Sequence, residues 1–527
     1  MVVIRNKRSD VEALFGKEWE IKIQEFSRVI GFTFEKDDRE IKIELNPDRP
    51  DLYSLLSIHN AMSKYHFKNI RNGNIGDLDM IINEEIVKSR PYLALFRTES
   101  PIPDSIVNIL RTDFLDYADK LSETVGKQRK KFAVGVHDAN KVNGPISYAQ
   151  GNGNTSFKAF DGIEGTLSQL MSEHEKGKKY GDNHNSNIII LQDKEGIISV
   201  PPMFNSFRTR VDNATSRYLV DITATSEQSL KLACKLLMGY FLSKGIDIGI
   251  ASTKTVKPSI VESYVDYVTM DVNNLEKLSG IKNFEMDSIK KTLGRMGYTF
   301  SDLMKEKTLR FKVPFERIDV MGEVDVIEDY LKSYGFSNIT ERVMQSTITG
   351  SPSPSRELEN NFRYLLASAN FQEIKSFILS KESFNADQIK IINPKSEDFS
   401  TIRDTLWHGL INFLELNRSA SYPQRLFEIG EIINNGTQET RVACISCGPE
   451  ASYSEIKGVL DLIIKSTGME IAEVKSERDT HFIEGRCAKF HTNSLITKGI
   501  IGEVSPKEIT EHQLTLPVSY LEFSIGV

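Results

Sequence analysis

The acidic segment from Val313 to Ile339, with the sequence VPFERIDVMGEVDVIEDYLKSYGFSNI, restricts the fold of this chain more than any other stretch. It opens with an apolar run that includes Pro314, and the residues from Val324 to Tyr334 are spaced as an amphipathic helix. The apolar positions of that helix recur at Val326, Ile327, Tyr330 and Leu331. The segment therefore predicts a short loop followed by a helix with one apolar face, whose acidic side faces outward.

Four carboxylates occur along this segment with D-x5-D-x2-E-D spacing, and they are Asp319, Asp325, Glu328 and Asp329. The last three stand at i, i+3 and i+4 of the predicted helix, which places them on one face. An all-oxygen set of this kind suits Mg²⁺, because a cation relieves the mutual repulsion of the carboxylates. An acidic first turn that complements the helix dipole explains the same pattern without a metal.

The composition describes a protein of several globular domains and excludes some classes. The chain has 527 residues, of which 39% are hydrophobic and 26% charged, and this length requires more than one core. No run of about 18 apolar residues is present, and the N-terminus becomes charged too early for a secretory signal. The four cysteines do not suggest a disulfide framework, and Cys444 and Cys447 lie in an apolar run that predicts a buried strand. We therefore expect a cytoplasmic protein.

The net charge limits how the chain binds nucleic acid. The formal charge is −7, whereas a protein that holds RNA by itself is usually basic, because phosphate neutralisation dominates such affinity. Two basic segments nevertheless fall within a region rich in predicted strands, at Lys127–Lys131 and Lys176–Lys179. Charge runs are usually solvated, but two on one β-rich module make a local site for an RNA end credible.

Several motifs together resemble the beta subunit of phenylalanine–tRNA ligase, in its archaeal or eukaryotic cytosolic form. The acidic segment carries that family's Pro-led strand, its R-x-D and its D-x-x-E-D helix, which ends in Y-G-F-x-N-I at Tyr334–Ile339. NPDRPDLYS, from Asn46 to Ser54, resembles the family's N-terminal signature, and its two prolines suggest a rigid loop with Arg49 at its tip. The resemblance implies that Asp319, Asp325, Glu328 and Asp329 bind Mg²⁺ where the catalytic alpha subunit makes contact.

The β-rich region resembles the editing module of the same family. The matching pieces are the G-x-H-D run that begins at Gly135, an E-K-G-x-x-Y loop, an S-x-P-P strand and a D-I-T strand. The resemblance implies an editing pocket made by Leu191, Ser199, Asp221 and Thr223. Ile190 replaces Leu191 if the alignment slips by one residue. No Ser-His-Asp or Cys-His arrangement is visible in the sequence, so attack by a positioned water is the simpler mechanism.

The C-terminal third resembles the catalytic-like module of the family, a class II synthetase fold that lacks its ATP motifs. A long helix is expected from Glu357 to Ala369, followed by a strand over FQEIKSFIL. Arg425 and Glu428 match the arginine and glutamate of motif two poorly, and EGRCA at Glu484–Ala488 lacks the glycines of motif three. The resemblance therefore implies a docking module without catalysis.

Together these observations predict an α+β multidomain protein with four modules. They are an N-terminal α/β module (1–88), a tRNA-editing module (89–262), a small winged-helix-like module with the Mg²⁺ site (263–345) and a class II synthetase-like antiparallel sheet with helices (346–527). The resemblance implies a beta subunit that assembles with the ATP-using alpha subunit into an α2β2 tetramer, binds tRNA(Phe) and hydrolyses mischarged tyrosyl-tRNA(Phe). The first alternative is a scaffold that hydrolyses nothing. The second alternative is a free-standing hydrolase of mischarged tRNA.

Overall fold

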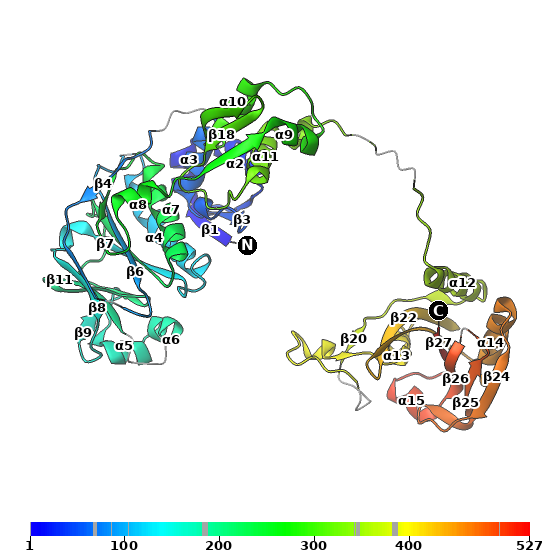
Figure 1. Cartoon of the computed structure of the whole chain (residues 1–527). Coiled ribbons are helices and arrows are strands. Elements are labelled where there is room, and N and C mark those ends of the chain that lie inside the picture. Colours follow the sequence, from blue (N-terminus) through cyan, green and yellow to red (C-terminus); the bar gives the residue numbers. More distant parts are fainter. Residues whose placement is uncertain are drawn as a thin grey trace. The chain divides into compact units, whose positions relative to one another are not determined.

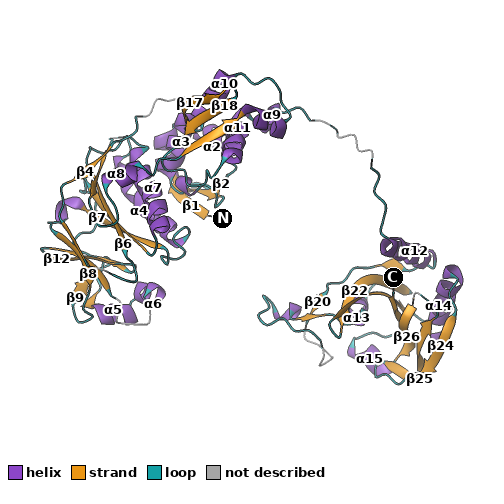
Figure 2. Ribbon diagram, viewed as in Figure 1, coloured by secondary structure: helices purple, strands orange, loops and turns teal. Residues whose placement is uncertain are grey.

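A computed structural model describes residues 2–66, 71–85, 87–103, 105–181, 188–341, 343, 348–381, 388–494 and 496–526. The chain divides into two compact units, Met1–Arg342 and Val343–Val527 (Figure 1). Both units combine helices with several sheets, so the fold is a mixed α/β multidomain one (Figure 2). None of the helices in the described parts of the chain has the length and apolar character that a membrane span requires.

The first unit begins with a small three-stranded antiparallel sheet in the order β1-β3-β2. Its strands are β1 (Val2–Lys7), β2 (Thr33–Lys36) and β3 (Glu40–Leu45), and its helices are α1 (Arg8–Phe15), α2 (Trp19–Ile30) and α3 (Leu55–Tyr65). Gly31 ends α2 in the left-handed region, with φ of 90°, and Ser54 caps α3 by accepting a hydrogen bond from the Ser57 backbone N–H. The loop at NPDRPDL therefore leads into a capped helix.

Arg49 differs from the expectation of a guanidinium at the tip of an exposed loop. It is only 8% exposed and forms two hydrogen bonds to Asp51, at 2.9 and 2.8 Å. The loop folds inward because the two side chains neutralise each other, which a pattern of flanking prolines does not reveal. Although burial raises the pKa of the Asp51 carboxyl, the Arg49 guanidinium beside it opposes that shift.

Two five-stranded sheets form the largest part of the first unit. One has the order β4-β15-β6-β14-β7, and the other has the order β13-β12-β11-β8-β5. The strands of the first are β4 (Ile75–Leu78), β6 (Tyr92–Thr98), β7 (Phe132–Asp138), β14 (Tyr218–Ala224) and β15 (Ile248–Ala251). Those of the second are β5 (Ile82–Glu84), β8 (Ile146–Gln150), β11 (Ile189–Asp193), β12 (Gly196–Val200) and β13 (Phe204–Asn205). Strands β11 and β12 pair antiparallel as a hairpin.

Alternation along β14 explains how this part is layered. Tyr218, Val220 and Ile222 pack in the core that also holds α4 (Val107–Glu123) and α7 (Glu227–Leu242). Leu219 points the other way and packs against Leu191 and Tyr148 of the second sheet. Shorter elements complete this part, namely β9 (Ser156–Lys158), β10 (Glu164–Thr166), α5 (Leu167–Glu173), α6 (Glu175–Tyr180) and α8 (Pro258–Glu262).

The acidic segment belongs to a small module at the end of the first unit. Its sheet has the order β16-β18-β17. Its elements are β16 (Tyr267–Asp271), α9 (Val272–Ser279), α10 (Met286–Arg295), β17 (Thr299–Lys305), β18 (Thr308–Lys312) and α11 (Glu323–Tyr334). Helix α11 contains the predicted Val324–Tyr334 helix, and Val326, Ile327 and Tyr330 are buried in the module's core as expected.

The second unit is built on a seven-stranded sheet in the order β19-β22-β23-β27-β26-β25-β24, with a two-stranded β20-β21 pair beside it. Its strands are β19 (Gln372–Glu373), β20 (Leu379–Ser380), β21 (Thr401–Ile402), β22 (Gln424–Asn434), β23 (Thr437–Cys447), β24 (Ile471–Ser476), β25 (Phe482–Thr492), β26 (Ile496–Val504) and β27 (Val518–Ile525). Its helices are α12 (Pro354–Ser368), α13 (Trp407–Leu416), α14 (Tyr453–Thr467) and α15 (Pro506–Glu511). Two apolar cores lie against this sheet. One includes residues of α12 and α14, and the other includes residues of α13.

Two expectations for this unit have different outcomes. Cys444 and Cys447 lie buried in β23, as the apolar run predicted. The single strand expected over FQEIKSFIL is wrong, since only its two ends pair, in β19 and β20. The intervening Lys375 and Ser376 instead bond through their side chains to the Ile429 carbonyl and to Glu428.

Candidate functional site

A cleft of about 730 Å³ opens in the first unit beside the edge strand β7. Its walls come from α4, from β7, from the segment between β12 and β13, and from the turn that follows β9. Ser199 and Asp221 both line it, so the structure brings two of the four predicted editing residues to one cavity. A cleft of this volume has room for an amino acid and part of a nucleotide.

Asp221 is a buried carboxylate, 1% exposed, on β14, which lies between β6 and the edge strand β7. Its Oδ2 lies 2.8 Å from Nε2 of His137, whose Nδ1 lies 2.9 Å from the Thr209 hydroxyl. An ionised carboxylate only accepts hydrogen bonds, so Nε2 of His137 donates to it. The pair holds Asp221 in one orientation at the wall of the cleft.

His137 and Gly135 are functional candidates that sequence reasoning missed. A Cβ atom at position 135 would lie 1.9 Å from Oδ2 of Asp221, so only glycine leaves room for the carboxylate beside the cleft. Both residues belong to the G-x-H-D run. The run itself is visible in the sequence, but the pairing of His137 with Asp221, 84 positions away, depends on the register of the strands.

The hydroxyls of Ser199 and Thr223 are buried, and neither forms a hydrogen bond within the described structure. Ser199 is 1% exposed and lines the cleft, whereas Thr223 is fully buried on the same face of β14 as Asp221. A buried hydroxyl without a partner costs free energy, and a ligand or water can supply the missing bond. Polar groups of this kind are the ones that fix the orientation of a bound molecule.

Leu191 lies elsewhere. It is fully buried between the two sheets, in an apolar cluster that includes Leu93, Leu95 and Leu219. Its backbone nevertheless pairs with that of Ser199 across the β11–β12 ladder. Ile190, the alternative at this position, faces a different apolar cluster beside α5. Leu191 therefore supports the strand that carries Ser199 rather than lining the cleft.

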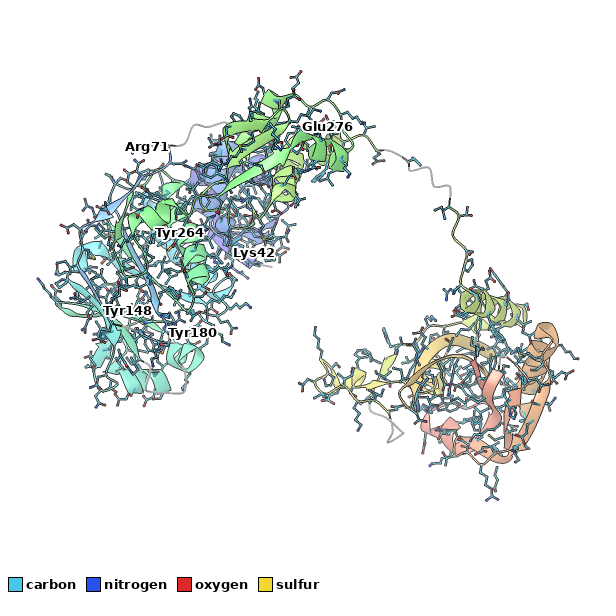
Figure 3. All side chains as sticks on the ribbon, viewed as in Figure 1. Lys42, Arg71, Tyr148, Tyr180, Tyr264 and Glu276 are labelled. Carbon is cyan, nitrogen blue, oxygen red and sulfur yellow. The ribbon has the colours of Figure 1, made fainter. Side chains whose placement is uncertain are left out.

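The first basic segment is tied to the cleft wall by Arg129. Lys127, Gln128 and Arg129 all have positive φ, between 49° and 61°, which non-glycine residues adopt only where other contacts compensate. The Arg129 guanidinium donates to the Pro202 carbonyl at 3.1 Å and lies 4.4 Å from the centre of the Tyr180 ring. Tyr180 stands at the end of α6, among the labelled side chains (Figure 3).

The remaining basic side chains are more accessible. Among them are Lys127, Lys130, Lys131, Lys176, Lys178 and Lys179, all of which are exposed. Lys176 also lines the cleft. Lys179 lies 3.4 Å from Glu123, an interaction that solvent weakens. Arg129 thus supports the site, and the lysines are the groups available to a phosphate.

The four carboxylates of the acidic segment are not brought together. Asp319 and Asp329 both pair with the buried Arg317, at 2.6 and 2.7 Å, and Asp329 also accepts a hydrogen bond from Tyr298. Asp325 caps α11 by accepting from the Met321 and Gly322 backbone N–H groups, at 2.7 and 2.8 Å. Glu328 is exposed and pairs with Lys332.

Arg317 therefore takes the place that a cation occupies in the predicted Mg²⁺ site. Burial acts to raise the pKa of Asp319, but the guanidinium holds it below its usual range. Within the described residues, no three His, Cys, Asp or Glu side chains are grouped as a metal site requires. This arrangement of donors does not fit Mg²⁺, because binding requires Asp319 and Asp329 to exchange Arg317 for the ion.

The polar residues expected as remnants of ATP motif two are engaged within the protein. Glu428 is fully buried and pairs with Arg403 at 2.7 Å. Arg425 pairs with Glu455 at 2.8 Å. Both charges are therefore satisfied by partners within the protein.

Comparison with known protein families gives three matches along the chain. Residues 116–253 match the B3/4 domain, residues 268–336 match the tRNA synthetase B5 domain, and residues 339–525 match the phenylalanyl tRNA synthetase beta chain CLM domain. The Asp221–His137 pair and most of the residues that line the cleft lie within the first match, and α11 lies within the second. The whole seven-stranded sheet lies within the third.

Similar proteins extend over the full length. A phenylalanine–tRNA ligase beta subunit from Thermoplasma volcanium is 32% identical, over 100% of this chain and 98% of that protein. One from Saccharolobus islandicus is 30% identical, over 93% of this chain and 92% of that protein. Among solved structures, an N-terminal fragment of the phenylalanyl-tRNA synthetase beta subunit from Pyrococcus horikoshii covers 63% of this chain and 99% of the fragment, with a TM-score of 0.55 and 22% identity. That likeness concerns the fold.

Proposed function

Because this chain belongs to the family of phenylalanine–tRNA ligase beta subunits, we propose that it edits tRNA(Phe) within an enzyme whose synthetic chemistry takes place on the alpha subunit. The enzyme joins L-phenylalanine to tRNA(Phe) at the expense of ATP, and this subunit contributes assembly, tRNA binding and hydrolysis of mischarged tyrosyl-tRNA(Phe). The observation that carries the editing proposal is the cleft with a buried carboxylate held by His137 at its wall.

The reason for a second site is a limit on discrimination by binding. Tyrosine is phenylalanine with one added hydroxyl, and an apolar pocket rejects such an addition by only roughly 10²-fold. In the cleft, Asp221 accepts a hydrogen bond from the phenol, which phenylalanine cannot offer. The correct product would leave that hydrogen bond unmade, with the carboxylate bonded to His137 alone, and this disfavours its binding.

The hydrolytic step uses water as the nucleophile. Its oxygen attacks the carbonyl carbon of the aminoacyl ester, the bond to the terminal ribose oxygen breaks, and that oxygen leaves with a proton that water supplies. The Ser199 and Thr223 hydroxyls have hydrogen-bonding capacity that the protein does not use, which suits them to orient substrate or water. Leu191 acts by supporting the strand of Ser199.

A scaffold that binds the alpha subunit and tRNA without hydrolysis is the alternative. It explains the second unit equally well but assigns no purpose to a buried carboxylate at a cleft. Deacylation of tyrosyl-tRNA(Phe) by the assembled enzyme separates the two functions. Hydrolysis faster than the spontaneous rate supports editing, and a rate equal to it supports the scaffold.

We predict that this chain alone does not form an aminoacyl-adenylate. The expected ATP motifs are absent from the sequence, and Arg425 and Glu428 are held by Glu455 and Arg403. ATP–pyrophosphate exchange with phenylalanine should remain at background for the folded chain and appear when the alpha subunit is added. Exchange by the chain alone would show that the second unit is catalytic.

The architecture of the assembly follows from the same family membership. We infer an α2β2 tetramer in the cytoplasm, with four modules at 1–88, 89–262, 263–345 and 346–527. The last resembles a class II synthetase domain that has lost its active site, and the third resembles a winged helix. Co-elution of this chain with a class II alpha subunit at the mass of a tetramer tests the stoichiometry.

A Mg²⁺ ion at Asp319, Asp325, Glu328 and Asp329 stays a prediction. It requires a rearrangement on assembly, since Arg317 now holds two of these carboxylates. If it forms, Asp325→Ala combined with Glu328→Ala should weaken Mg²⁺ binding by the assembled enzyme and destabilise the tetramer. Calorimetric titration with Mg²⁺ measures the first effect. If assembly does not depend on the metal and the variant loses only about 1 kcal/mol, the residues serve as a helix cap.

A further inference from the structure

The mouth of the cleft carries an aromatic side chain that the editing chemistry does not use. Phe160 follows β9 and is 49% exposed, although it lines the same cleft as Asp221. Its backbone N–H donates to the Asn205 carbonyl, which fixes it beside the segment that follows β12. A single exposed apolar ring does not by itself mark a contact surface, so the residues beside it decide what it can bind.

A second aromatic residue carries two cations beside it. The Arg210 guanidinium carbon lies 4.0 Å from the centre of the Phe207 ring, and the Lys158 amino group lies 4.9 Å from it. The Phe207 backbone N–H donates to the Lys158 carbonyl, and Ala159 pairs with Ser206. Phe160 and Phe207 therefore stand on neighbouring, hydrogen-bonded segments. We call Phe160, Phe207, Lys158 and Arg210 the rim platform.

The chemistry of the rim platform suits nucleobases. Unpaired bases stack on aromatic rings and on guanidinium planes, and each such contact is largely independent of base identity. The acidic residues nearby are Glu164, 3.9 Å from Lys158 and exposed, and Asp161, which pairs with His174. The cleft walls carry nearly equal numbers of acidic and basic side chains. The cleft walls therefore offer a phosphate little net attraction, and stacking on the rim platform would add to what the exposed lysines supply.

We propose that the rim platform binds the unpaired nucleotides at the 3′ end of the RNA, with the terminal base stacked on Phe160 and the preceding one on the Phe207–Arg210 pair. This rests on the proposed editing function, which supplies RNA as the ligand. The aminoacyl group, which is attached to the terminal ribose, then enters the cleft towards Asp221. The platform acts on binding, and the chemical step is left to the residues inside.

The test uses the assembled enzyme and tRNA(Phe) whose terminal adenine is replaced by 2-aminopurine, a base whose fluorescence falls when it stacks. We expect Phe160→Ala to raise the tRNA concentration that gives half of the site-dependent fluorescence change by roughly 5- to 100-fold. Arg210→Met should raise this concentration by a smaller factor. The matched control is Phe336→Ala, which truncates an equally exposed aromatic residue, 58% exposed, outside the cleft-lining set. It should leave the signal unchanged.

A second readout distinguishes this inference from the editing function itself. In single-turnover deacylation of tyrosyl-tRNA(Phe), Phe160→Ala should raise the half-saturating enzyme concentration about 10-fold and leave the maximal rate unchanged. If wild type deacylates and both platform variants match it in binding and in half-saturation, the inference is wrong while editing stands. If wild type does not deacylate, editing is wrong and the fluorescence arm still decides on the platform. A loss of alpha-subunit assembly in Phe160→Ala with intact RNA binding would make the platform a protein contact and overturn the proposal.

Discussion

Asp221→Ala should abolish the preference of the assembled enzyme for hydrolysing tyrosyl-tRNA(Phe), lowering that rate by roughly 10²-fold. The carboxylate is the buried acceptor at the wall of the cleft, and a hydrogen bond to a charged group contributes about 1.5–3 kcal/mol. Synthesis of phenylalanyl-tRNA(Phe) should continue at the wild-type rate, because it takes place on the alpha subunit. Deacylation of preformed tyrosyl-tRNA and aminoacylation with phenylalanine, measured on one preparation, check both parts.

A neighbouring carboxylate provides the matched control. Asp138 is also buried, but it bonds to the Asn140 backbone N–H and to the Thr215 hydroxyl. Asp138→Asn should therefore leave the preference for tyrosyl-tRNA in place even where it lowers stability. If Asp138→Asn and Asp221→Ala lose deacylation equally, the effect is one of folding, and Asp221 has no specific part in recognition.

Arg317→Met should destabilise the first unit by about 3–5 kcal/mol, the cost of leaving buried carboxylates without a counter-charge. Arg317 is 3% exposed and pairs with Asp319 and Asp329, the second of which is itself 3% exposed. Its backbone carbonyl also accepts a hydrogen bond from Lys235 on α7, so it lies where the small module meets the rest of the unit. Urea unfolding followed by tryptophan fluorescence in a Trp407→Phe background measures the loss, since Trp19 of the first unit is then the one tryptophan in the chain.

Two further variants show whether the loss comes from the unpaired charges. Arg5→Met removes an exposed ion pair with Glu40 and should change the free energy of unfolding by less than about 1 kcal/mol. Adding Asp329→Leu to Arg317→Met should recover part of the stability, because one uncompensated buried carboxylate disappears. If the double variant is no more stable than Arg317→Met alone, the ion pair is not what stabilises the module.

Local patterns predicted the elements around the site well. The apolar spacing in the acidic segment predicts α11 within one residue at its start, and the apolar run around Cys444 and Cys447 predicts the buried strand β23. The outward direction of the acidic side was wrong for Asp329. Val326, Asp329 and Tyr330 stand at i, i+3 and i+4 on the buried face, so Asp329 follows its apolar neighbours into the core. Sequence spacing showed the position of this carboxylate but not the buried Arg317 that makes it tolerable.

The contacts across distant strands were beyond what a single sequence shows. The G-x-H-D run and the D-I-T strand are both visible in the sequence, yet the bond between His137 and Asp221 depends on the pairing of β7 with β14. Leu191 and Ser199 were grouped as pocket residues, and they are indeed paired on β11 and β12. Residues that lie opposite each other on two paired strands point to the same face of the sheet. Whether they are buried depends on what covers that face, and the alternation within one strand does not reveal this.

The most direct test of the central claim is the ratio of two deacylation rates. The assembled wild-type enzyme is given tyrosyl-tRNA(Phe) and phenylalanyl-tRNA(Phe) separately, and the loss of each ester is followed in a single turnover. A cleft that recognises the phenol through Asp221 predicts that the tyrosyl ester is hydrolysed at least about 10-fold faster. Equal rates for the two esters, or a preference that survives in both Asp221→Ala and Thr223→Ala, would contradict the account.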